Sequence, residues 1–184
     1  MDKISELMVE QLRDAYSAEK QALRAMPRMA KKATSQALKD AVGMHVEQTQ
    51  RQVERLDQAL QAMGARAGRK VCEGMRGILE EGQSELEEHD KGPILDTVIV
   101  AALQRVEHYE IAAYGTMAAL AKAARQREVA GLLAETLKEE KETDRKLSQL
   151  AESELNPAAI AEGAEEDEPK PARGQRGRKG AAAA

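Results

Sequence analysis

Four long stretches of the chain carry an apolar residue at every third or fourth position. This spacing is typical of helices that bury one face. It predicts helices over residues 2–33, 36–63, 94–124 and 127–154. Only a few residues separate the first helix from the second and the third from the fourth. We therefore expect two antiparallel helical hairpins.

The second half of the chain repeats the pattern of the first. A shift of about 91 positions aligns the two halves without a gap and places Glu19 on Glu110, each in the middle of an apolar stripe. Leu12 falls on Leu103 in the same alignment. An internal repeat of this kind indicates two equal structural units. We predict that each hairpin brings an inward glutamate to the same level of the molecule.

The two hairpins are joined by a long, glycine-rich connection over residues 65–92, whose apolar positions predict a short helix across the bundle. Two hairpins with such a crossover define the ferritin-like arrangement. We therefore predict an all-α, ferritin-like four-helix bundle as one domain over residues 1–155. From residue 156 to 184 an acidic run, a basic run and Pro and Gly residues predict a disordered tail.

The composition supports this fold and narrows the setting. The 184 residues include no Phe or Trp, one Cys and five Pro, and strong helix formers dominate. A single cysteine rules out an internal disulfide and favours a reducing compartment. No apolar run is long enough to span a bilayer, so we expect a cytoplasmic protein without a membrane partner. The net charge of −4 indicates no particular partner. We expect no nucleic-acid partner either, since acidic residues 162–168 precede basic residues 170–179.

Carboxylates on the buried faces of the helices are the main candidates for chemistry. Glu110 lies inside the apolar stripe of the third helix, and Glu107 lies at its edge one turn earlier. Glu19 and Glu140 take inward positions on the first and fourth helices. A buried carboxylate is costly unless it is neutralised, paired or bound to a metal. Because four carboxylates balance two divalent ions and oxygen ligands suit iron or manganese, we predict a dinuclear Fe or Mn site.

Further residues are either additional candidates for the metal site or part of an alternative in which the carboxylates are structural. His45 lies beside the stripe of the second helix, and Asp144 follows Glu140 by one turn, so both are additional ligand candidates. In the alternative, the carboxylates pair with arginines such as Arg24 or Arg105 and the site is structural. The three tyrosines are either hydrogen-bond partners for these carboxylates or ordinary core residues: Tyr16, Tyr109 and Tyr114.

Four segments resemble the DUF892 family, the YciF-like stress proteins of bacteria within the ferritin-like superfamily. They lie on all four long helices, at residues 14–20, 45–49, 106–112 and 139–144. The resemblance implies a rubrerythrin-like bundle, often dimeric, and we therefore expect a homodimer. It also implies that Glu107 and Glu110 bind a metal pair and that Glu19 is the first-helix ligand.

The resemblance has departures as well. Rubrerythrins usually carry Glu-x-x-His on the second and fourth helices, whereas the matching positions hold Thr49 and Gln52, then Glu140 and Thr143. No rubredoxin-like cysteine pattern is present to supply electrons. Two functions follow as alternatives: a metal-binding stress protein with oxidase or peroxide-consuming activity, and a non-enzymatic structural or interaction protein whose metal site is degenerate.

Overall fold

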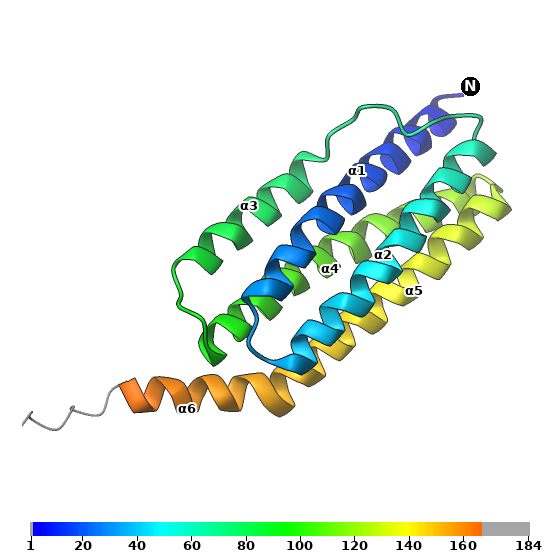
Figure 1. Ribbon diagram of the computed structural model, residues 1–184. Coiled ribbons are helices and arrows are strands. Elements are labelled where there is room, and N and C mark those ends of the chain that lie inside the picture. The colour runs from blue at the N-terminus through cyan, green and yellow to red at the C-terminus, as the bar shows by residue number, and fades with distance from the viewer. Residues whose placement is uncertain (1, 167–184) are drawn as a thin grey trace, which may run out of the picture.

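Four long helices lie side by side in a bundle, and a shorter helix covers one side of it (Figure 1). The computed structural model describes residues 2–166, and this part of the chain contains helices and no strands. The bundle helices are α1 (Lys3–Lys32), α2 (Gln36–Ala62), α4 (Pro93–Ala123) and α5 (Arg127–Leu150). The predicted all-α class is confirmed.

The bundle helices associate as the two predicted hairpins. Helix α1 packs along α2 and α4 packs along α5, while α1 also contacts α4 and α2 contacts α5. In the turn between α1 and α2, Ser35 accepts a hydrogen bond from the Leu38 amide and begins the second helix. Asp96, buried on α4, accepts hydrogen bonds from the amides of Thr34 and Ser35, at 2.7 Å each. Asp96 therefore ties the first hairpin to the second, a role that the helical pattern of the sequence does not predict.

The connection between the hairpins contains α3 (Glu73–Glu87), as predicted. This helix packs against α4 and α1 on the outside of the bundle (Figure 1). The two helices approach closely at Gly82, because a Cβ atom there would lie 3.1 Å from the Cβ of Ala102 on α4. The absence of a side chain at Gly82 lets the two helices meet. The crossover therefore leaves the four long helices free to surround one core.

The core consists of two apolar clusters with a buried polar layer between them. One cluster includes Val42, Leu103 and Leu147, and the other includes Leu56 and Tyr114. Apart from Asp96, the buried polar positions along each bundle helix fall between members of the two clusters. The buried polar side chains of this layer are Glu19, His45, Thr49, Gln52, Glu107, Glu110, Thr136 and Glu140. The bundle therefore encloses charged groups at mid-height, far from its ends.

The chain continues as a helix beyond the predicted domain boundary. A π-helical turn, η1 (Ala151–Leu155), leads into α6 (Asn156–Glu166), which projects from one end of the bundle (Figure 1). The prediction of a disordered tail from residue 156 is therefore wrong for this segment. Pro157 lies in the first turn of α6, where its missing N–H is tolerated, and Glu162 accepts a hydrogen bond from the Ile94 amide at 2.7 Å. Residues 167–184, including the basic run, lie outside the described residues.

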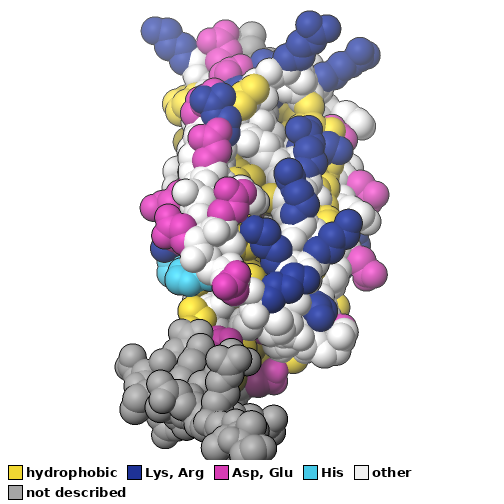
Figure 2. All heavy atoms as spheres, turned by 60° about the vertical axis from the view of Figure 1, so that its left-hand side comes forward, with side chains coloured by type: hydrophobic (Ala, Val, Ile, Leu, Met, Phe, Trp, Pro, Cys, Tyr) yellow, Lys and Arg dark blue, Asp and Glu magenta, His cyan; other side chains and the backbone are white. Residues whose placement is uncertain are grey.

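The outer surface is mostly polar. On the face shown in Figure 2, Lys and Arg side chains gather in a column beside a group of acidic side chains. In the part of the chain that the structure describes, the large exposed apolar side chains are Ile4, Leu7, Met44, Val71 and Ile160. Within residues 2–166, no helix combines the length and the apolar character that crossing a bilayer requires.

Candidate metal centre

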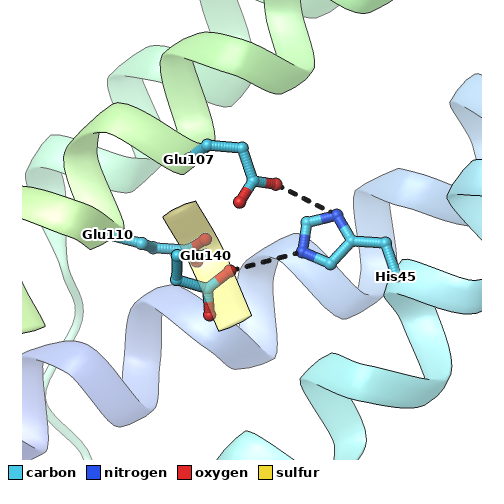
Figure 3. Close-up of side chains that lie close together, drawn as sticks. All are labelled: His45, Glu107, Glu110 and Glu140. Atoms are coloured by element: carbon cyan, nitrogen blue, oxygen red, sulfur yellow. Dashed lines mark ion pairs between the residues drawn. The ribbon is translucent and has the colours of Figure 1, made fainter. Parts of the chain in front are cut away.

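Four side chains of the polar layer converge on one point. His45 comes from α2, Glu107 and Glu110 from α4, and Glu140 from α5 (Figure 3). One nitrogen or carboxylate oxygen from each lies within 4.8 Å of the others. Glu107 and Glu110 share a helix face because residues three apart project in similar directions. The structure thus brings together four of the six residues that the sequence singled out as ligand candidates.

The imidazole of His45 lies between two of the carboxylates (Figure 3). Its Nδ1 is 3.1 Å from Glu107 Oε1, and its Nε2 is 3.8 Å from Glu140 Oε2. Burial lowers the pKa of His45 to about 4, so the ring is neutral at neutral pH. A neutral imidazole is the form that binds metal ions. His45, a secondary candidate in the sequence, therefore belongs to the centre of the group.

Glu19 lies beside this group. It is buried on α1, and the Tyr114 hydroxyl donates a hydrogen bond to its Oε1 at 2.5 Å. Burial and the charge of Glu140 raise the pKa of its carboxyl group, as expected for a member of the same buried polar layer. Of the three tyrosines, Tyr114 is thus a partner for a predicted ligand. Tyr109 instead donates to Asp14 at 3.2 Å.

Asp144 and the two arginines are not part of this group. Asp144 is half-buried and accepts a hydrogen bond from Gln104 at 3.1 Å, while His108 Nε2 lies 3.2 Å from the same oxygen. Arg105 pairs with Glu85 on α3, and Arg24 is exposed on α1. The idea that these arginines neutralise the inward carboxylates is therefore wrong.

Most carboxylate oxygens of the polar layer have no hydrogen-bond partner among the described residues. Seven side-chain atoms of the five clustered residues are buried and have no hydrogen-bond partner among residues 2–166. Leaving a buried polar atom unsatisfied costs about 1–3 kcal/mol, and more for a charged group. The atoms belong to Glu19, His45, Glu107, Glu110 and Glu140. Such a set of oxygen and nitrogen donors fits one or more divalent cations, which would satisfy them together.

Burial and mutual repulsion also shift the carboxyl groups toward their protonated forms. Burial and the charges of neighbouring carboxylates raise the pKa values of Glu19, Glu107 and Glu110 well above the usual range. Burial raises the pKa of Glu140 to about 7. Perturbed groups that share one site are typical of functional centres. A bound cation would reverse the shift, because it favours the ionised carboxylates.

A charged network on the flank of the polar layer was not anticipated from the sequence. Arg55 of α2 makes two hydrogen bonds to Glu139 of α5, at 2.6 and 2.7 Å, and a third to Thr136 at 3.2 Å. Gln52 donates to the same Glu139 at 3.1 Å. The sequence contained one signal for this network, because Arg55 and Glu139 stand beside the apolar stripes of two helices that we expected to be neighbours. Arg55 places a positive charge close to the carboxylates without neutralising any of them directly.

The bundle, the crossover and the buried His/Glu cluster define an all-α protein of the ferritin-like type. A ferritin-like diiron-carboxylate protein from Bacillus anthracis shares this architecture, with a TM-score of 0.65 and 14% identity over 82% of this chain and 99% of that chain. At this identity the similarity supports the fold alone. The predicted ferritin-like architecture is thereby confirmed.

The family model of DUF892, described as a domain of unknown function, matches residues 3–160, and the chain belongs to this family. Protein YciF of Escherichia coli strain K12 is 41% identical over 160 residues, which cover 86% of this chain and 96% of that protein. The crystal structure of YciF, described as an E. coli stress protein, has a TM-score of 0.80 over 85% of this chain and 99% of that chain. YcfI of Rhodopseudomonas palustris is similar too, with 38% identity and a TM-score of 0.77 over 80% of this chain and 94% of that chain.

Proposed function

We propose that the protein binds two divalent iron or manganese ions in the polar layer. The observation that supports this proposal is the set of seven buried, unpartnered ligand atoms at one level of the bundle. An imidazole with several carboxylates is a donor set typical of iron and manganese sites. The residues proposed as ligands are Glu19, His45, Glu107, Glu110 and Glu140.

The surrounding side chains orient these proposed ligands and hold them in a form that can bind metal. Tyr114 donates to one oxygen of Glu19 and leaves Oε2 without a partner. Burial keeps His45 neutral and able to bind metal. The apolar clusters on either side exclude water, which strengthens electrostatic interactions within the layer. When bound, an iron or manganese pair supplies the electrons needed to reduce oxygen or a peroxide.

The biological setting proposed is a bacterial stress response, with oxidase or peroxide-consuming activity at the metal centre. The 41% identity with YciF, which is described as a stress protein of E. coli, supports this part of the proposal. With one cysteine, the given sequence has no cysteine pair that could form a rubredoxin-like electron-transfer site. The expected homodimer rests on the family resemblance alone and stays a prediction.

The metal site is tested by titrating chelator-treated protein with Mn²⁺ and, anaerobically, with Fe²⁺. We expect Glu110→Gln to weaken binding by at least tenfold, because it removes a buried ligand oxygen with little change in volume. Glu54→Gln is the matched control, since Glu54 is exposed on the same bundle. Equal affinities for wild type and Glu110→Gln would contradict the proposed ligand set.

A structural protein with a degenerate site is the second candidate. Thr49 and Gln52 favour it, because both are buried in the polar layer at the positions where rubrerythrins usually carry Glu and His. A metal that binds only the native state must stabilise it. In the structural alternative, the melting temperature of the protein does not respond to Fe²⁺ or Mn²⁺, whereas the proposed metal site requires an increase.

A further inference from the structure

A pocket between α2 and α5 leads from the surface to the polar layer. Its volume is about 260 Å³, and its walls include Val42, Leu103 and Leu147, with His45 among the lining residues. The three apolar residues are buried members of one core cluster. The apolar core cluster therefore forms the base of the pocket.

His45 connects this pocket with the clustered carboxylates. It is the single member of the four-residue group that lines the pocket. Its exposed fraction is 4%, whereas Glu107 and Glu140 are 0% exposed. A molecule in the pocket would therefore contact the imidazole first and would be separated by it from the carboxylates.

The opening of the pocket is polar and has an excess of positive charge. Arg51 and Lys146 both line it and are exposed, and Glu47 is the one acidic residue among its lining residues. Arg51 has no ion pair within the described part of the chain, and Lys146 lies 3.8 Å from Glu142. Cations would be repelled at this opening, whereas a carboxylate would be attracted.

We propose that this pocket binds a small organic monocarboxylate. Its carboxylate lies at the opening near Arg51 and Lys146, and its apolar end lies against Val42, Leu103 and Leu147. The volume corresponds to about nine water molecules at ~30 Å³ each, which suits a short aliphatic or aromatic acid. An apolar interior with a few placed polar groups is typical of small-molecule sites.

The binding itself does not require a metal. That the bound acid is a substrate rests on the proposed metal centre, because its apolar end would lie beside His45. The pocket would then select organic substrates by their apolar part, with the carboxylate fixing their orientation.

Octanoate is the probe for this site, titrated into the full-length, chelator-treated protein with methyl groups labelled for NMR. We expect saturable shifts at the methyl groups of Val42, Leu103 and Leu147, and none at Leu56 in the other cluster. Ala41→Leu should abolish them, since Ala41 lines the pocket. Ala37→Leu is the matched control, because Ala37 is exposed one turn earlier on α2.

The charged opening is tested separately. The double variant Arg51→Gln/Lys146→Gln should weaken octanoate binding about fivefold (~1 kcal/mol). Arg24→Gln/Lys31→Gln makes the same charge change on α1 and should leave binding unchanged. Octan-1-ol should bind more weakly than octanoate to the wild type. Non-saturating shifts, binding that persists in Ala41→Leu, or equal binding of the alcohol would overturn the proposal, whatever the metal titrations show.

Discussion

Glu140 shares the polar layer with three other buried glutamates, and its pKa of about 7 has a consequence for stability. In the unfolded chain its pKa is near the usual ~4.5. A raised pKa in the native state stabilises the fold at low pH, and this contribution is lost as pH rises through about 7. His45 acts in the opposite direction, but only below its unfolded pKa of ~6.5. The contribution of His45 therefore fades above pH 6.5, where the carboxylates dominate the pH dependence.

We predict that the free energy of unfolding of the metal-free protein falls between pH 6.5 and 8. The native state still holds protons that the unfolded chain has released, which amounts to about 1.4 kcal/mol per pH unit for each such proton. Glu140→Gln should flatten this dependence, since it also removes a charge that acts on the neighbouring carboxylates. Urea denaturation at several pH values measures the effect, with Glu54→Gln as control. A dependence that is equally steep in Glu140→Gln would be inconsistent with the assignment.

Tyr114 gives a second prediction at the scale of one residue. Its hydroxyl is the hydrogen-bond partner of Glu19 Oε1, and both side chains are buried. We expect Tyr114→Phe to weaken Mn²⁺ or Fe²⁺ binding by about tenfold, the effect typical of partners that orient a ligand. Tyr16→Phe is the control, because Tyr16 lies at the edge of the same cluster. If Tyr114→Phe binds metal as well as wild type, Glu19 does not depend on this contact.

Helical periodicity predicted which way most site side chains point, but not which of them extend to the centre of the cluster. Glu110 and Glu140 lie within apolar stripes, and both are buried in the cluster. Asp144 follows Glu140 by one turn, yet its shorter side chain turns toward Gln104 and the partly exposed flank. The position of His45 depended on how closely α2 approaches α4 and α5. That distance is set by packing, so a single helix pattern could not reveal it.

At the scale of elements, the polar layer depends on the internal repeat. Helices α1 and α4 occupy equivalent places in the two hairpins and carry Glu19 and Glu110 at matching positions. Helices α2 and α5 add His45 and Glu140 at the same level. Apolar residues precede and follow each of these positions, so the layer is sealed on both sides. The elements therefore hold charged groups where isolated carboxylates would be too costly.

Helix α6 gives a prediction at this scale. Glu162 accepts a hydrogen bond from the Ile94 amide at the start of α4, where the helix has unpaired N–H groups. We expect Glu162→Ala to lower the free energy of unfolding by about 1 kcal/mol, as for the loss of a helix cap. Thermal unfolding measures the change. Glu152→Ala serves as control, because Glu152 is exposed in η1. If Glu162→Ala loses no more stability than Glu152→Ala, the contact between Glu162 and the Ile94 amide does not stabilise the fold.

The four bundle helices and the crossover helix were predictable because each buries one continuous apolar face. Helix α6 was not, since its composition is acidic and includes Pro157 and Gly163. Its order depends on contacts with α4 that are distant in sequence, including that of Glu162. The Asp96 link between the hairpins is of the same kind. Local pattern therefore predicted the elements, and tertiary contacts determined where the folded unit extends.

At the scale of the whole molecule, the bundle encloses one buried layer of ionisable side chains. The two apolar clusters stabilise the bundle and also isolate the carboxylates from water. The pocket between α2 and α5 reaches this layer at His45. The family and the fold follow from sequence and architecture, whereas we propose the metal because of the unpartnered side-chain atoms. The metal is therefore the claim on which the functional account depends.

Elemental analysis of the protein purified without chelators, with metal counted per chain, tests this claim most directly. The account predicts about two iron or manganese ions per chain, since the cluster offers an imidazole and four carboxylates. The Glu110→Gln variant, purified in parallel, should contain much less metal. A protein that contains neither ion, even after anaerobic loading with Fe²⁺, would contradict the account and leave the carboxylates with a structural role.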